Sequence, residues 1–364
     1  MQIIDEIVGK NILDKLCRIE DFYAPEDFVM FDIETTGLSA ERAFIYLIGI
    51  NHYKDGEWHI TLYFNDDGIS ESEILENFMD FIKSKKVLAH FNGDNFDIPF
   101  VSKRIDILNM KSSAAIANNF HLLESVDLLK IVRPYKNSLG LPNIRQKTVE
   151  RYLGINRIDM YDGGQMIGVY LNYLSLFKSL DRYDLDPERY RDLVRREDIE
   201  QKIEDQKSLF IQHNRDDMEG MFHLTSILAV RALSRGENES IKCSFEEVSG
   251  RLNLIMNAHL KYRLPGHIDS PFKGASLLAE DYDAYLRIPV QMDTLRYYYG
   301  GTKKSFSEKS GFFIKQPKES VTAEYKEAPK DKESYLLLDD QFLGNEELIQ
   351  KYFKGMMYHM LYWK

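Results

Sequence analysis

The sequence predicts an α/β fold in which a mixed sheet is flanked by helices, with a smaller β-rich region at the C-terminal end. Three observations support this prediction. The apolar run Phe28–Phe31 leads directly into Asp32 and Glu34, as a short buried strand would. Two β-rich runs meet at Asp55-Gly56, a pair typical of antiparallel hairpins. Strand-like and helix-like segments then alternate to about residue 233, as in sheets covered by helices.

The length and composition favour a globular protein of two domains. The chain has 364 residues, more than a usual single domain, and 44% hydrophobic content, enough for a large core. A linker-like stretch begins at Gly236, so we expect domains at 1–235 and 236–364. The net charge of -11 argues against a protein covered in basic surface, but a local basic stripe could still bind nucleic acid.

The sequence predicts neither a membrane span nor a structural disulfide. No apolar run approaches the roughly 18 residues of a membrane span, and Asp5 and Glu6 interrupt any signal-like apolar start. Cys17 and Cys243 are far apart and lie in no metal-binding pattern. These features predict a cytoplasmic protein without a membrane partner.

The elements expected in the first domain follow from hydrophobic periodicity. Alternating or continuous apolar runs predict strands, and apolar residues every three to four positions predict helices. The expected strands are 28–32, 44–50, 58–64 and 87–91, and the expected helices are 5–20, 70–86, 96–105, 166–180 and 207–233. In the C-terminal region, the runs 241–248, 251–259 and 286–292 predict further strands.

The first acidic motif is Asp32-Ile33-Glu34, followed by Thr35, Thr36 and Gly37. In a strand, residues two apart share a face, so Asp32 and Glu34 project together while Ile33 points to the opposite layer. Two anions held this close repel each other unless a cation lies between them. The pair therefore predicts half of a divalent-metal site, and the alternative is a strand end whose carboxylates face water or cap a helix.

The second motif follows the strand predicted at 87–91. Asn92-Gly93 predicts a turn, and a helix is expected from Phe96 onward. Asp97 would then stand near the end of a strand, where open α/β sheets place their sites. The alternative is that Asp97 simply stabilises the start of its helix, and Asp94 could be a helix cap of the same kind.

The third motif lies in the long helix expected at 207–233. His213 and Asp217 are four residues apart, so they share one face of that helix and can point into one site. A single histidine on a helix is more often a packing residue. The carboxylate one turn away and the two earlier acidic motifs favour a functional role.

A basic segment lies between the second and third motifs, in a chain that is acidic overall. Its cations, interleaved with tyrosines and prolines, could contact a polyphosphate backbone. A solvated helix and loop face is an equally good explanation for any one of them. The basic residues are Lys130, Arg133, Lys136, Arg145, Lys147, Arg151 and Arg157.

Together, the three motifs resemble the DEDD superfamily of 3′–5′ exonucleases, which has an RNase H-like fold, and most closely the bacterial YprB-type RNase H-like domains. The resemblance covers residues 28–233. It implies two divalent cations, Mg²⁺ or Mn²⁺, bound by the four carboxylates Asp32, Glu34, Asp97 and Asp217. It also implies that His213 orients the attacking water or accepts its proton. Members with tyrosine place it four residues before the last aspartate, and those with histidine usually place it five before, so His213 occupies the tyrosine spacing.

The resemblance further implies residues that contact the substrate. Those expected near the terminal nucleotide are Thr35, Thr36, Leu38, Asn92 and Phe96. For the two threonines and Leu38, the alternative is a role in closing the turn after the strand. The implied function is metal-dependent 3′–5′ exonuclease activity on nucleic acid with a single-stranded 3′ end. The alternative is a catalytically idle RNase H-like module that binds nucleic acid or protein, and the presence of all four acids favours the enzyme.

Overall fold

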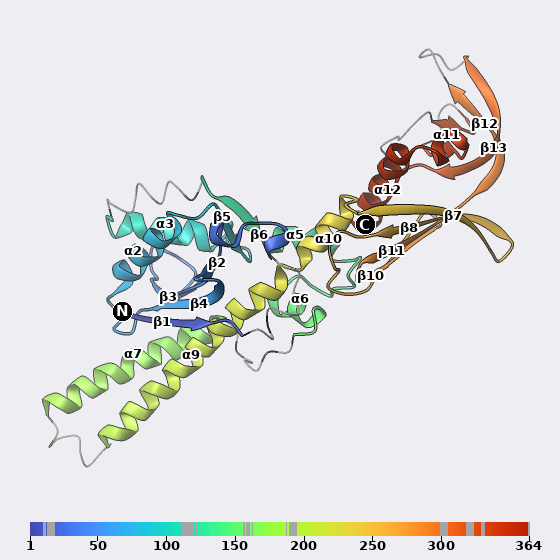
Figure 1. Ribbon diagram of the computed structural model, residues 1–364. Coiled ribbons are helices and arrows are strands. Elements are labelled where there is room, and N and C mark those ends of the chain that lie inside the picture. The colour runs from blue at the N-terminus through green and yellow to red at the C-terminus, as the bar shows by residue number, and fades with distance from the viewer. Residues whose placement is uncertain are drawn as a thin grey trace. The chain divides into compact units, whose positions relative to one another are not determined.

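The computed structural model divides the chain into two compact units (Figure 1). Unit 1 comprises residues 1–130 and 154–225, and unit 2 comprises residues 131–153 and 226–364. The sequence-based boundaries at 1–235 and 236–364 remain a prediction. The structure describes residues 1–9, 12, 19–110, 120, 122–155, 157, 161, 163–186, 188, 195–298, 305–317, 324–328 and 332–362.

Unit 1 is built on a mixed six-stranded sheet, which confirms the predicted fold class. In spatial order its strands are β1 (Gln2–Ile7), β4 (Glu57–Phe64), β3 (Ile45–Lys54), β2 (Phe28–Thr35), β5 (Val87–His90) and β6 (Glu124–Asp127). The central strand β2 is antiparallel to β3 and parallel to β5, and β5 is parallel to β6. The first acidic motif therefore lies where the antiparallel and parallel halves of the sheet meet.

The predicted hairpin is present as β3 and β4. Tyr53 pairs with Trp58 and Lys54 with Glu57, leaving Asp55 and Gly56 at the turn. Both turn residues have positive φ, 53° for Asp55 and 89° for Gly56, as a type I′ hairpin turn requires. The Asp-Gly pair thus sets the register of the two strands.

The helix expected at 5–20 is wrong in its first part. Residues 2–7 form the edge strand β1, which pairs with β4 from Gln2 opposite Phe64 to Ile7 opposite His59. Side-chain burial alternates along β1 as in a strand, and Asp5 accepts hydrogen bonds from Thr61 Oγ1 and His59 Nδ1 on β4. Pairing with β4 therefore overrides the helical spacing. Residues 10–11 and 13–18 lie outside the described part of the chain.

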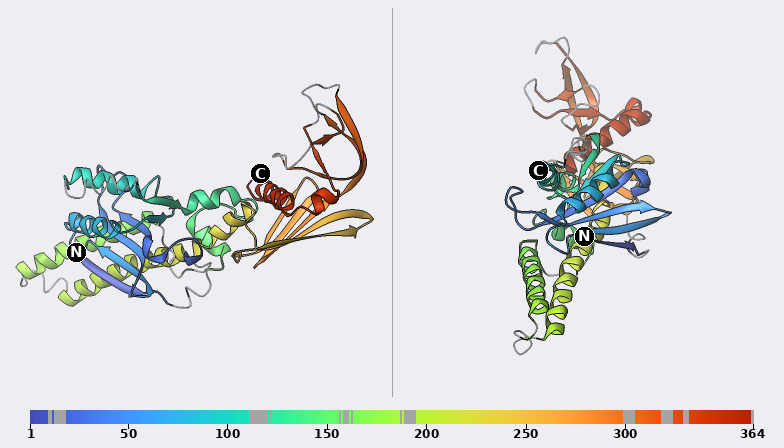
Figure 2. Two further views of the ribbon diagram at one scale, coloured as in Figure 1. Left: turned by 45° about the horizontal axis from the view of Figure 1, so that its top comes forward. Right: turned by 90° about the vertical axis from the view of Figure 1, so that its left-hand side faces the viewer.

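Helices cover both faces of this sheet (Figure 1). Helices α2 (Glu71–Ile82) and α3 (Asp97–Ile107) lie on one face, where their apolar residues pack with Val29, Phe31 and Ile33 of β2. Helices α7 (Gly163–Leu185) and α9 (Arg196–Leu224) lie on the other face and run side by side, as Figure 2 also shows. The alternation of β2 thus turns Asp32 and Glu34 toward the α9 face.

The helix predicted at 207–233 is divided in two. Helix α9 ends at Leu224 and begins earlier than expected, and α10 spans Ile227–Ser234. At the end of α9, the hydroxyl of Thr225 donates to the carbonyl oxygen of Phe222, so this carbonyl has a partner where the helix stops. The third motif lies within α9 as expected.

Unit 2 contains the predicted C-terminal β-rich region. One sheet is five-stranded and antiparallel, in the order β7-β8-β11-β10-β9, and four further strands form a closed barrel. The strands are β7 (Ser240–Val248), β8 (Arg251–His259), β9 (Ile268–Phe272), β10 (Ala275–Glu280), β11 (Asp283–Pro289), β12 (Gln291–Tyr298), β13 (Phe306–Lys315), β14 (Tyr325–Lys326) and β15 (Tyr335–Leu337). The run predicted at 286–292 spans the end of β11 and the start of β12.

Several helices complete the chain. They are α5 (Leu128–Val132), α6 (Gln146–Tyr152), α11 (Asp340–Leu343) and α12 (Glu346–Leu361). Asn345 precedes α12 as its N-cap, and its side chain accepts the N–H of Leu348. None of the described helices combines the length and apolar character needed to span a membrane.

Candidate functional site

Strand β2 places Asp32 and Glu34 on one face of the sheet, as their spacing predicts. Glu34 is 7% exposed, and its Oε2 accepts a hydrogen bond of 3.2 Å from the Tyr46 hydroxyl on β3. Asp32 Oδ2 accepts a bond of 3.4 Å from Asn214 Nδ2 on α9. Both acids are therefore held by neighbouring elements rather than extending freely into water.

Asp97 is the first residue of α3 and is 4% exposed. Its Oδ1 accepts a 3.2 Å hydrogen bond from the backbone N–H of Ile33, the residue between Asp32 and Glu34. The parallel pairing of β2 with β5 brings the chain after β5 back to β2 and so makes this contact possible. Asp97 thus both begins a helix and joins the first acidic motif.

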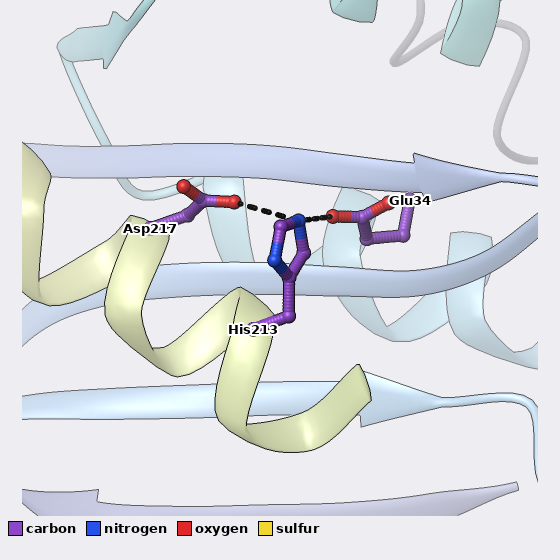
Figure 3. A group of neighbouring side chains, drawn as sticks. All are labelled: Glu34, His213 and Asp217. Carbon is purple, nitrogen blue, oxygen red and sulfur yellow. Dashed lines mark ion pairs between the residues drawn. The ribbon is translucent and has the colours of Figure 1, made fainter. Parts of the chain in front are cut away.

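His213 lies between two acids (Figure 3). Its Nε2 is 3.4 Å from Glu34 Oε1 and 3.4 Å from Asp217 Oδ2. His213 and Asp217 come from successive turns of α9, as the four-residue spacing predicts, and Glu34 comes from β2. One ligand atom from each of the three residues lies within 4.8 Å of the other two, a separation that a single cation could bridge.

The geometry distinguishes Asp217 from the neighbouring Asp216. Asp217 faces His213, whereas Asp216 is turned aside, where its Oδ1 accepts a 2.6 Å bond from Gln212 Nε2. Adjacent residues on a helix differ by about 100° in direction, so only one of the two can face the sheet here. That residue is Asp217.

Arg157 also reaches this cluster. Its Nη1 forms an ion pair with Asp217 Oδ1, and the Arg157 side chain is only 6% exposed. The sequence allowed a phosphate contact or a solvated face for the basic segment. For Arg157 the solvated face is wrong, because this guanidinium is buried among carboxylates.

The four acids lie close enough to act on the ionisation of Asp32. The pKa of Asp32 is raised well above its ordinary value, first by burial and then by the charges of Asp97, Asp217 and Glu34, while Arg157 opposes the rise. Burial also raises the pKa of Asp97 to about 7, although the hydrogen bond from Ile33 opposes it. A cluster of acids that resist ionisation together is one that a cation would stabilise.

Sequence reasoning missed two residues that shape this site. Asn214 is fully buried, and its Oδ1 has no hydrogen-bond partner within the described structure. Gly49 lies directly opposite Asp32 in the pairing of β2 with β3, and a Cβ there would lie 2.2 Å from Asn214 Oδ1. Gly49 therefore leaves the space that Asn214 fills. An asparagine following the histidine of the third motif was the available signal.

A second group of possible ligands lies at the ends of β5 and β6, comprising His90, Asp94 and Asp127. His90 Nδ1 accepts the N–H of Gly93, and its Nε2 lies 3.0 Å from Ser125 Oγ. Asp94 pairs with Lys130 Nζ at 2.5 Å, and the N-cap position of α3 belongs to Phe96 and not to Asp94. His90 and Asp94 therefore already have protein partners.

Asp127 was also missed by the sequence reasoning. Its Oδ1 accepts the backbone N–H groups of Asn92, Leu129 and Lys130, tying the turn before Asp97 to the start of α5. Its charge contributes to the raised pKa of Asp97. Asp127 therefore holds the segment that positions Asp97.

The expected substrate-contacting residues fall into two groups. Thr35 donates to the carbonyl oxygen of Gly37, Thr36 accepts the N–H of Phe44, and Phe96 packs against the apolar core beside Phe100, contacts that support a structural role. Leu38 is 85% exposed, and Asn92 has a positive φ of 70° at its turn. Leu38 is thus the member of the set most accessible to a ligand.

The residues of the first cluster fit divalent cations. Hard ions such as Mg²⁺ and Mn²⁺ prefer oxygen ligands, and this site offers four interacting carboxylates and a histidine. Burial and then the neighbouring acids raise the pKa of Asp32, and Arg157 opposes that rise only in part. Bound cations would add positive charge where these acids meet.

The fold and site together define a class: α/β proteins with a carboxylate-lined site beside the central strand of a mixed sheet. The sequence model of the RNase H superfamily matches residues 29–229, more than half of the chain, and the chain belongs to this superfamily. No curated protein matches the chain. Membership indicates a nuclease or related hydrolase in general, with nucleic acid as its class of partner.

Proposed function

We propose that this protein is a metal-dependent 3′–5′ exonuclease of the DEDD type, similar to YprB-type domains, that hydrolyses phosphodiester bonds at a single-stranded 3′ end. One observation carries the proposal. Acids from three separate segments, on β2, at the start of α3 and on α9, converge on one place: Asp97 accepts the N–H of Ile33 beside Asp32, and Glu34 and Asp217 each lie 3.4 Å from His213 Nε2. The superfamily match and the histidine among these acids support the same reading.

The four carboxylates have distinct environments that suit them to binding two divalent cations. Asp32 is the member on which Asp97, Asp217 and Glu34 all act, so it is our candidate for the shared ligand. When bound, such ions polarise the phosphodiester and provide a water-derived nucleophile at neutral pH. The carboxylates thus fix where the reaction takes place.

His213 is the candidate for handling the proton of the attacking water. It is buried, and its Nε2 points at Glu34 and Asp217 rather than at solvent. A neutral imidazole in this position can accept a proton at Nε2 or orient a water by hydrogen bonding.

The test uses Asp32→Ala, with Asp216→Ala as the matched control. Each variant removes one carboxylate, but Asp216 bonds to Gln212 and faces away from His213. Wild type and D216A should degrade end-labelled single-stranded DNA or RNA with Mg²⁺ or Mn²⁺, and D32A should lose about 10³-fold or more in rate. Equal activity of D32A and wild type would refute the site assignment.

The same assay separates the alternatives. Labels at either end, with 3′-blocked substrates, report polarity and distinguish stepwise removal from internal cleavage. A catalytically idle module would bind the oligonucleotide without metal-dependent turnover in any variant. His213→Tyr tests the spacing: we expect it to retain measurable activity, whereas a folded but inactive H213Y would contradict the tyrosine-type alignment.

A further inference from the structure

Asp217 has protein partners at both carboxylate oxygens. Oδ2 lies 3.4 Å from His213 Nε2, and Oδ1 pairs with Arg157 Nη1. A guanidinium remains charged at any pH at which a protein is folded. Asp217, a proposed metal ligand, is therefore already paired with a permanent cation.

We propose that Arg157 is an internal counter-cation that competes with the divalent ions for Asp217. This inference rests on the metal site proposed above. The Arg157 side chain is buried, so its charge is poorly screened by water and acts on the acids around it. Its effect reaches Asp32, whose pKa it lowers against the opposing acids.

The competition follows from charge and space. A divalent ion at Asp217 lies close to the guanidinium held on Oδ1, and the two cations repel each other at this range. Metal binding is therefore favoured when the Arg157–Asp217 pair opens. If the pair is formed about 90% of the time, the apparent Kd for the metal is raised about tenfold.

The pair has a second consequence for the cation-free protein. Arg157 supplies a buried positive charge beside the acids of the cluster, and its removal would leave their mutual repulsion less compensated. Arg157 thus stabilises the empty site and at the same time sets the metal concentration needed to fill it. Removing it should tighten metal binding and weaken the cation-free fold together.

The test measures Mn²⁺ binding directly, by calorimetry and by electron paramagnetic resonance, without substrate. Arg157→Gln should bind Mn²⁺ about tenfold more tightly than wild type. Arg215→Gln is the matched control, because it removes the same charge from α9 but Arg215 pairs with Glu6 and Glu219. R215Q should bind Mn²⁺ within about twofold of wild type.

Each outcome is decisive. Unchanged or weaker Mn²⁺ binding by folded R157Q overturns the competition, and weaker binding would show that Arg157 instead holds Asp217 in place for the metal. Failure of wild type and R157Q alike to bind Mn²⁺ overturns the metal site itself and this inference with it. Equal tightening in R215Q and R157Q would show a general charge effect and would also overturn it.

A second measurement is made on the wild type, in case R157Q does not fold, and uses Arg157→Lys to assign the resonance. Titration with Mg²⁺ should shift the Nε–H resonance of Arg157, assigned by its loss in Arg157→Lys, because the ion pair breaks as the metal binds. Metal binding with no change in this resonance would overturn the proposal. R157K keeps the charge but not the planar fork, so its Mn²⁺ affinity should lie between those of wild type and R157Q.

Discussion

Replacing Glu34 by Gln should stabilise the protein when no metal is present. A carboxylate oxygen of Glu34 lies within 4.8 Å of one from Asp217. Two charges at that distance repel by about 3.5 kcal/mol at an effective dielectric constant of about 20. Contacts of His213 and Arg157 with these acids offset part of this, so we expect a net gain of about 1–2 kcal/mol. Gln can still accept the hydrogen bond from Tyr46.

The assay follows unit 1 alone. The chain has two tryptophans, and replacing Trp363 by Phe leaves Trp58, which packs edge-on against Phe222 within unit 1. Its fluorescence during thermal unfolding in EDTA should give a Tm about 3–6 °C higher for E34Q than for the Glu34 parent. Glu76→Gln, which neutralises an exposed acid on α2, should leave the Tm unchanged within about 1 °C.

Adding Mn²⁺ should reverse the order of the two Tm values, so that the parent becomes more stable than E34Q. At a concentration about 100 times its Kd, a bound metal stabilises the fold by about 2.7 kcal/mol, and the parent should show that gain. E34Q has lost a proposed ligand and should show a much smaller one. A lower Tm for E34Q in EDTA, or equal stabilisation of both proteins by Mn²⁺, would refute the view that mutual repulsion of these acids prepares the site for a cation.

Two further predictions concern positions beside the site and away from it. Gly49→Ala should destabilise unit 1 by about 1–3 kcal/mol and weaken Mn²⁺ binding, because the new Cβ would collide with Asn214 and Met218. The control is Gly168→Ala in α7, where a Cβ meets nothing within 4 Å. Equal urea midpoints for the two variants would contradict the packing argument. Burial lowers the pKa of His52 to about 4, below the roughly 6.5 of the unfolded chain, so its contribution to stability is complete above pH 6.5 and is lost as the pH falls toward 4. That loss amounts to at most about 3 kcal/mol, and the urea midpoint of His52→Gln should therefore fall less than that of wild type between pH 7 and 4.

Local rules predicted the parts of the structure that depend on neighbouring residues. The alternation of β2 set which face carries Asp32 and Glu34, and the Asp55-Gly56 pair set the hairpin. The same local rules gave the wrong prediction for the N-terminal segment. Whether residues 2–7 form a helix or a strand was decided by the free edge of β4, more than 50 residues away, which no local pattern reveals.

The acids of the site could be found from the sequence, but the residues that balance them could not. Carboxylates at strand ends and helix faces follow from spacing, whereas Arg157 was one cation among seven in a basic segment. Its burial beside Asp217 singles it out, and that burial depends on the folded structure.

The placement of Arg157 bears on how the cluster could form at all. Three segments distant in sequence bring acids together before any metal is present, and folding must overcome their repulsion. A buried guanidinium and the hydrogen bond from Asn214 each reduce that cost. Because a divalent cation would take over part of this neutralisation, metal affinity and cation-free stability should change together in variants of this cluster.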